Sequence, residues 1–223
     1  LRSTRPLADP IGHPMRIALI HALRHSPPPI EAAFQELWPQ PSLMNLLDDS
    51  LSADLARDGG LTPAMTDRFL ALARYAAGTG AAGILYTCSA FGACIDAVKQ
   101  AFPHIPVLKP NEAMIEEAAE ASGTVGLLAT FAPTLASMPQ EFPAGISVRP
   151  KLAEGALAAL DRGDFAEHDR LAALAGRDLA ECQVIALAQF SLARAAPAVA
   201  AATGRRVLTT PHSAVRKLRT ILA

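Results

Sequence analysis

The feature that most constrains the fold is an internal repeat with a period of 101 residues. At this shift residues 84–89 (ILYTCS) align with residues 185–190 (IALAQF). Pro110, which follows Cys88 by 22 positions, aligns with Pro211. In both halves an apolar strand is followed by a polar turn, a helix, a second strand, a proline and another helix. Because the order of elements repeats, we predict a fold built from two similar halves.

Short apolar runs bounded by turn residues alternate with longer helical patterns along the whole chain. This alternation is typical of βαβ units that form a parallel sheet. The predicted strands are residues 16–21, 42–47, 83–87, 107–109, 124–129, 147–149, 183–188 and 206–209. The predicted helices are residues 30–37, 62–78, 111–121, 166–181 and 213–222, and the prolines 27–29 are predicted to form a rigid extended turn. Thr62 is the expected N-cap of its helix, with Pro63 in the first turn.

These patterns predict an α/β fold of two pseudo-symmetric Rossmann-like lobes. Each lobe would hold a mostly parallel sheet flanked by helices, with the functional site in the cleft between the lobes. The expected bounds are residues 15–109 for the first lobe, 110–209 for the second, 210–223 for a C-terminal helix that packs back on the first lobe, and 1–14 for an N-terminal arm.

Composition argues against several classes of partner. The chain has 20 basic and 21 acidic residues, and no single-sign tract that would bind nucleic acid or an anionic membrane. Apolar runs are far shorter than the roughly 20 residues that span a bilayer, and residues 1–14 lack the apolar core of a secretory signal. The three cysteines form neither a disulfide framework nor a zinc-ligand pattern. We therefore expect free thiols and a reducing cytoplasm.

Residues at the carboxyl ends of the predicted strands are the first candidates for a site. Ligands of open parallel sheets bind beyond these ends, against the N-termini of the helices that follow. The residues at or just beyond these ends are His21, Asp48, Asp49, Cys88, Ser89, Thr130, Phe131, Gln189 and His212. Two lobes that face each other would bring these side chains into one cleft.

At these positions the chain resembles the aspartate/glutamate/hydantoin racemase superfamily. The resemblance rests on residues 83–92 (GILYTCSAFG), on residues 126–130 (GLLAT) followed by Thr134, and on the repeat, and it covers residue 15 to the C-terminus. It implies two Rossmann-like lobes and no cofactor. It also implies two cysteines, one from each lobe, on opposite faces of a substrate carbon, beside small polar residues that hold a carboxylate.

The chain departs from this family pattern at one of the two cysteines. Cys88 matches the first family cysteine, whereas Gln189 stands at the place of the second. An amide neither gives nor takes a proton near neutral pH, so the two-thiol mechanism does not carry over intact. The superfamily also includes one-thiol relatives similar to arylmalonate decarboxylase, in which the single cysteine belongs to the other half.

Cys88 is the leading catalytic candidate. A thiol at a strand end, entering a turn and a helix, is expected to be accessible and to have a lowered pKa. The alternative is a small buried hydrophobe, which is how we interpret Cys94 and Cys182.

The remaining candidates are polar residues near the same strand ends. Ser89, Thr130 and Thr134 would offer hydroxyls to a substrate carboxylate or enolate, or would cap helices instead. His212 would act as a base or bind substrate, or would cap its helix. His21 and Gln189 are predicted substrate contacts, and Asp48 would orient an ammonium group or cap a turn. The histidines 13, 25, 104 and 168 are predicted to lie on the surface or in loops.

Three functions fit these residues. The first is a cofactor-independent racemase or isomerase that acts, through Cys88, on a carbon next to a carboxylate or carbonyl of a small acid. The alternatives are a single-cysteine decarboxylase-like lyase and a catalytically degenerate protein that binds a small carboxylate. Gln189 favours the binding protein, and the intact turn at Cys88 favours an enzyme. The expected ligand is a small carboxylate, an amino acid or a hydantoin-like molecule, without metal, nucleic acid or membrane, and the oligomeric state, a homo-oligomer included, stays open.

Overall fold

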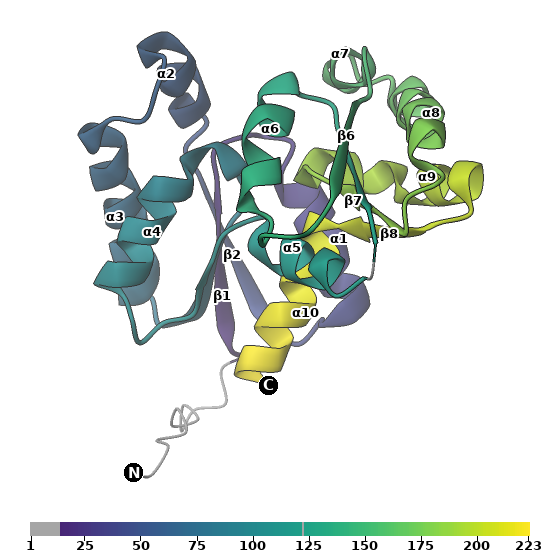
Figure 1. The fold of residues 1–223 in the computed structure, drawn as a ribbon. Coiled ribbons are helices and arrows are strands. Elements are labelled where there is room, and N and C mark those ends of the chain that lie inside the picture. The colour runs from purple at the N-terminus through teal and green to yellow at the C-terminus, as the bar shows by residue number, and fades with distance from the viewer. Residues whose placement is uncertain (1–13, 122) are drawn as a thin grey trace.

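The computed structural model describes residues 14–121 and 123–223, which form two parallel four-stranded sheets (Figure 1). The strand order of the first sheet is β2 (Ser42–Leu47), β1 (Arg16–His21), β3 (Ala81–Tyr86), β4 (Val107–Leu108). That of the second is β6 (Val148–Leu152), β5 (Val125–Ala129), β7 (Val184–Leu187), β8 (Arg206–Thr209). Within each sheet every pairing between neighbouring strands is parallel. The predicted α/β fold of two pseudo-symmetric lobes is confirmed.

The first sheet lies between two layers of helices. Its outer face is covered by α2 (Ser50–Asp58), α3 (Pro63–Gly78) and α4 (Gly92–Ala101), which follows the short 3₁₀ helix η1 (Ser89–Phe91). Its inner face is covered by α1 (Pro27–Leu37) and by the C-terminal helix α10 (Thr210–Leu222). As predicted, Thr62 caps α3 by accepting a hydrogen bond from the backbone N–H of Met65.

The second sheet is covered in the same way. On one face lie α5 (Glu112–Ala119), α6 (Ala132–Ser137) and the 3₁₀ helix η2 (Met138–Glu141). On the other face lie α7 (Ala156–Asp161), α8 (Phe165–Gly176), η3 (Arg177–Leu179), η4 (Phe190–Ala195) and α9 (Ala196–Thr203). The central strands β5 and β7 are buried throughout, which explains their continuous apolar sequence.

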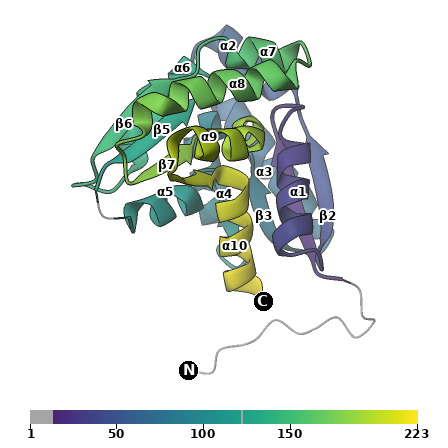
Figure 2. The ribbon, with the colours of Figure 1, turned by 90° about the vertical axis from the view of Figure 1, so that its right-hand side faces the viewer.

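The two lobes exchange one helix each. Helix α5 follows β4 of the first sheet but packs on β7 and β8, and α10 follows β8 but packs on α1 and β3 (Figure 2). Gly83 of β3 permits this approach, because a Cβ there would lie 3.0 Å from Leu222 Cδ1 of α10. Ion pairs of Arg216 with Glu117 and of Lys217 with Glu116 join the two exchanged helices. The exchange ties the lobes together on the side of the molecule where these helices meet.

One local prediction is wrong. Pro27, Pro28 and Pro29 do not form an extended turn but the first turn of α1. The backbone N–H groups of a first helical turn have no partner within the helix, so proline loses nothing there and its fixed φ suits the helix.

Part of the predicted N-terminal arm, residues 1–13, lies outside the described residues. In the ranges that the structure describes, no helix combines the length and the apolar character needed to cross a membrane.

Candidate active site

Cys88 and Gln189 occupy equivalent positions in the two lobes. Cys88 follows β3 and precedes the 3₁₀ helix η1, and Gln189 follows β7 and precedes η4. Each lies at the carboxyl end of the third strand of its sheet, with extended backbone angles. The repeat therefore places a thiol in one lobe where it places an amide in the other.

Cys88 is the one thiol of the three that is not fully buried. Its side chain packs against the apolar cluster on the outer face of the first sheet. This burial raises the pKa of the Cys88 thiol, although hydrogen bonds from the backbone of Ala90 and the side chain of Ser52 act in the opposite direction. The predicted lowering of the pKa is therefore wrong, because loss of water around the thiolate outweighs the two hydrogen bonds.

Ser52 is a site neighbour that the sequence did not reveal. It lies in α2, and its hydroxyl donates its one proton to the carbonyl oxygen of Ala22 at 2.9 Å, while the hydroxyl lies near enough to Cys88 to act on the pKa of the thiol. Helix α2 buries only Leu51, so its apolar contacts are few. Ser52 thereby connects this helix both to Cys88 and to the segment after β1.

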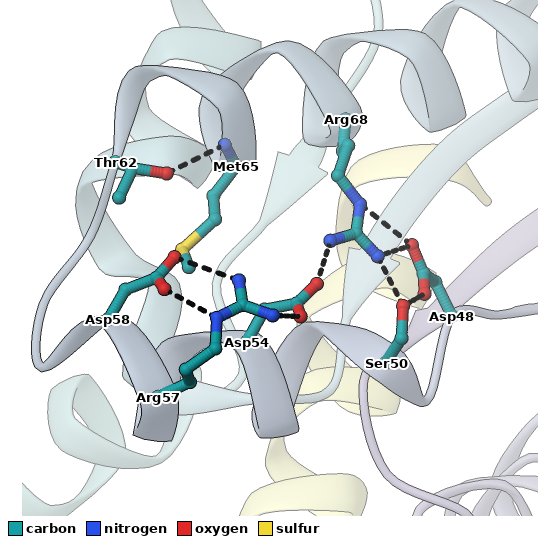
Figure 3. Close-up of polar contacts among 8 residues, drawn as sticks. All are labelled: Asp48, Ser50, Asp54, Arg57, Asp58, Thr62, Met65 and Arg68. Atoms are coloured by element: carbon teal, nitrogen blue, oxygen red, sulfur yellow. Dashed lines mark hydrogen bonds and ion pairs between the residues drawn. The ribbon is translucent and has the colours of Figure 1, made fainter.

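Asp48 holds α2 in place. Its carboxylate accepts hydrogen bonds from the Arg68 guanidinium of α3, with the Nε–Oδ2 distance at 3.1 Å, and from the Ser50 hydroxyl at 2.6 Å (Figure 3). The same guanidinium bonds to Asp54 of α2 at 2.6 Å. Burial on its own would raise the pKa of Asp48, but Ser50 and Arg68 together lower it below its usual value. The structure thus gives the Asp48 carboxylate partners within the protein, Arg68 and Ser50.

His21 is completely buried at the end of β1. Its Nδ1 lies 2.8 Å from the Thr87 hydroxyl and its Nε2 lies 2.9 Å from Asn45 Oδ1, while the Asn45 amide donates to Glu31 at 2.6 Å. Burial lowers the pKa of His21, with Asn45 and Glu31 opposing the shift. With both ring nitrogens occupied, His21 anchors the residue before Cys88 and has no free nitrogen for a substrate.

Gln189 is bound to Thr130 at the end of β5. Both the backbone N–H and the hydroxyl of Thr130 donate to Gln189 Oε1, at 2.6 and 3.0 Å. Because a backbone N–H can only donate, the amide oxygen must face Thr130. The two N–H bonds of Gln189 Nε2 make no hydrogen bond to any described residue, so this strand end offers donors and no proton carrier.

The side chains of His212 and Thr134 make no hydrogen bond to the Cys88 turn. His212 Nδ1 lies 2.7 Å from the Thr209 hydroxyl and Nε2 lies 3.1 Å from Glu36 in the last turn of α1. That turn leads back to the amino edge of the first sheet, whereas Cys88 lies at its carboxyl edge. Thr134 is buried in α6, and the structure records no hydrogen bond of its side chain to a described residue.

His168 was predicted to be a surface or loop residue, and this is wrong. It lies fully buried in α8, with Nδ1 2.8 Å from Asp169 Oδ1 and with Nε2 lacking a partner among the described residues. Its face of α8 turns inward because the helix packs on both α7 and α9. Along the same described ranges no group of three or more histidine, cysteine or acidic side chains could hold a metal ion.

A pocket of about 200 Å³ lies between the lobes beside the Cys88 turn. Its walls are Ser89, Gly92, Ala93 and Asp96 of the first lobe, Lys109, Pro110 and Asn111 of the connection, and Glu141 of the second lobe. Of the predicted site residues, only Ser89 lines it. Asn111 and Glu141 were not predicted, although the alignment of Asn111 with His212 in the repeat was a signal that could have found the first of them.

No family model matches the sequence, and no curated protein matches it. Solved structures do. Allantoin racemase from Klebsiella pneumoniae is similar with a TM-score of 0.69 and 16% identity, over 93% of this chain and 87% of that one. An aspartate racemase homologue from Pyrococcus horikoshii has the same TM-score at 15% identity, over 93% and 98%. Arylmalonate decarboxylase has a TM-score of 0.63 at 16% identity, over 93% and 92%.

These similarities agree with the two-lobed architecture and with the resemblance seen in the sequence. The chain has the fold of the aspartate/glutamate/hydantoin racemase superfamily. At this level of identity the similarity establishes the fold, and the activity must be argued from the site.

Proposed function

We propose that the chain is a cofactor-independent enzyme of the racemase or isomerase type, which acts through Cys88 on a carbon next to a carboxylate or carbonyl of a small acid. The observation that carries the proposal is the place of this thiol. Cys88 is half-buried at the carboxyl end of β3, whereas Cys94 and Cys182 are buried. The racemases among the structural neighbours support the same reaction class.

In this reaction the Cys88 thiolate removes the acidic proton. The electron pair of the broken C–H bond moves into the neighbouring carboxylate or carbonyl and forms an enolate. The Ser89 hydroxyl and the N–H groups of Gln189 are the donors proposed to stabilise the developing negative charge. Because burial raises the pKa of Cys88, its thiolate is a strong base but a small fraction of the thiol near neutral pH. The rate should therefore rise with pH through and above the ordinary thiol range.

The absence of a thiol at position 189 has a stereochemical consequence. A single base takes the proton from one face of the carbon and returns it to the same face. Exchange of the substrate proton with solvent should then be faster than inversion of configuration, because inversion requires a proton from solvent water on the opposite face of the enolate. In a two-thiol enzyme inversion accompanies each complete turnover.

A decarboxylase-like lyase is the second candidate, and the raised pKa of Cys88 favours it. Loss of carbon dioxide from a malonate breaks a carbon–carbon bond and leaves the electron pair as the same enolate. The neutral Cys88 thiol then donates its proton to one face of that carbon. The similarity to arylmalonate decarboxylase agrees with this candidate at the level of fold.

A panel of amino acids, hydantoins and malonates incubated with the protein in deuterium oxide tests both candidates. Proton NMR measures loss of the α-proton signal, and chiral chromatography and released carbon dioxide separate exchange, inversion and decarboxylation. The Cys88→Ala variant should lose all three, and Cys182→Ala, which removes a buried thiol from the other lobe, should retain them. A ligand that raises the melting temperature without any of these reactions would instead support the binding protein.

A further inference from the structure

Asn111 presents a buried side-chain amide that has no hydrogen-bond partner among the described residues. It connects β4 to α5 and is 2% exposed, yet its side chain makes no hydrogen bond to any described residue and does not cap α5. The side-chain polar atoms sealed from solvent without a partner, among the described residues, are His168 Nε2 and Thr210 Oγ1. The Asn111 amide is therefore not sealed from solvent, and Asn111 is one of the residues that line the pocket.

An unpaired amide in such a place favours an occupant that pairs with it. The Asn111 side chain offers two N–H donors and one carbonyl acceptor in a single plane. Leaving these groups unpaired in a largely buried position costs free energy that a complementary ligand recovers. The complement of a primary amide is another group with a carbonyl oxygen and an N–H.

The charged residues that line the pocket determine which ligand charge it can bind. Lys109 is already paired with Asp96, with Nζ 2.7 Å from Oδ2, so its charge is locally neutralised. Glu141 has no hydrogen-bond or ion-pair partner among the described residues. Although Glu141 as a residue is exposed, the protein around its carboxyl excludes part of the water there and raises its pKa, with Lys109 opposing the rise and Asp96 adding to it. The walls thus carry one excess acidic group, which repels a carboxylate and accepts an N–H.

We propose that this interlobe pocket binds the planar amide group, a carboxamide or a ureido group, of a small ligand. Asn111 pairs with the carbonyl and one N–H of that group, the Ser89 hydroxyl donates to its carbonyl, and Glu141 accepts a further N–H. A second carboxylate of the ligand is excluded by Glu141 and Asp96. As part of a substrate site the pocket rests on the proposed function, because Ser89 directly follows Cys88.

Binding of small probes tests the pocket without any turnover. Propionamide and N-methylurea are titrated against the ¹⁵N-labelled protein, with sodium propionate and propylammonium chloride as probes of matched size. The side-chain amide resonances of Asn111, assigned by their loss in Asn111→Leu, should shift with the two amides. Propionate should bind at least about tenfold more weakly, and Asn111→Leu should weaken the amides by about tenfold.

Three variants separate the outcomes. Glu141→Gln lies on the surface, so it should fold, and it should bring propionate close to propionamide in affinity. Glu112→Gln, adjacent to Asn111 but paired with Lys99 outside the pocket, should change nothing. Cys88→Ala should bind the amides unchanged, so loss of turnover and loss of the pocket are distinguishable. Equal binding of propionate, stronger binding of propylammonium, or undiminished amide binding in Asn111→Leu would overturn the proposal.

Discussion

The carboxyl ends of β3 and β7 are equivalent in the fold and opposite in their chemistry. Cys88 lies at the end of β3 and packs against an apolar cluster. Ser52 of α2 lies beside the thiol. Gln189 lies at the end of β7, and two hydrogen bonds from Thr130 fix the oxygen of its side-chain amide. One end carries a titratable group whose pKa is set by burial, and the other carries a neutral donor held in one orientation. A symmetric backbone can therefore support an asymmetric reaction, in which proton transfer belongs to one lobe only.

The surroundings of the two strand ends also differ, because side-chain hydrogen bonds and ion pairs gather near the end of β3. His21 ties the residue before the thiol to Asn45 of β2, and the Arg68 contacts with Asp48 and Asp54 hold α2 against α3. At the second strand end Phe190 packs across the lobe boundary into the cluster of β1, α1 and α10. The contacts at the end of β3 thus hold the residues next to the thiol, whereas the packing at the end of β7 joins the two lobes.

Removal of the thiol should have the largest effect. Cys88→Ala is expected to lower turnover by about 10²- to 10⁴-fold, the usual contribution of a proton-transfer group. Gln189→Ala should lower it by about tenfold, because it removes one hydrogen-bond donor. Steady-state kinetics on the best substrate of the panel measure both values. Equal losses in the two variants would show that the strand ends do not differ in the way proposed here.

Alkylation should separate the thiols next. Iodoacetamide is expected to label Cys88 at least about tenfold faster than Cys94 or Cys182, because a half-buried thiol is reached more easily than a buried one. Since burial raises the pKa of Cys88, its labelling rate should still increase above pH 8.5, the approximate pKa of a free thiol. Peptide mass spectrometry of timed samples gives the rates, with the unfolded protein as the reference for equal reactivity. Faster labelling of Cys182 would contradict the assignment.

A thiol returned to the second strand end should restore symmetry. Gln189→Cys is expected to raise the ratio of inversion to exchange by about tenfold, because it supplies a proton carrier for the second face. Phe190 is packed into the lobe boundary, so it does not compete with the new side chain. Gln189→Ser loses the same contacts to Thr130 without gaining a thiol, and it serves as the control. An unchanged ratio in Gln189→Cys would mean that the two strand ends do not face one substrate carbon.

The smallest effect concerns the helix above the thiol. Asp48→Asn should destabilise the fold by about 0.2–1 kcal/mol at pH 7, the range for partly exposed ion pairs, and should increase Cys88 labelling a few-fold. The pKa of Asp48 is lower in the folded protein than in the unfolded chain. Its contribution is therefore present above the ordinary aspartate pKa and lost as the pH falls through the folded value. Urea unfolding at pH 7 and pH 3 measures this difference, with Asp49→Asn, which removes an exposed pair with Arg24, as the control.

Several features of the site could be predicted because they depend on sequence position alone. The 101-residue shift aligned Cys88 with Gln189, and both lie after the third strand of their sheets. The prolines 27–29 misled the prediction locally, since they suit either an extended turn or the first turn of a helix, which in this protein is α1. The roles of Asp48 and His21 could not be deduced, because their partners Arg68 and Asn45 are distant in sequence.

The sequence by itself determined the two-lobed parallel architecture and the chemical identity of the two strand ends. Hydrophobic periodicity and the order of elements are local properties, and a repeat displays them twice. The tertiary structure alone decided the direction of the Cys88 pKa shift, the contacts that occupy His21 and Asp48, and the pocket that joins Ser89, Asn111 and Glu141. Each of these depends on which groups lose their contact with water and which side chains, distant in sequence, come to lie beside them. Both are determined only when the whole chain has packed.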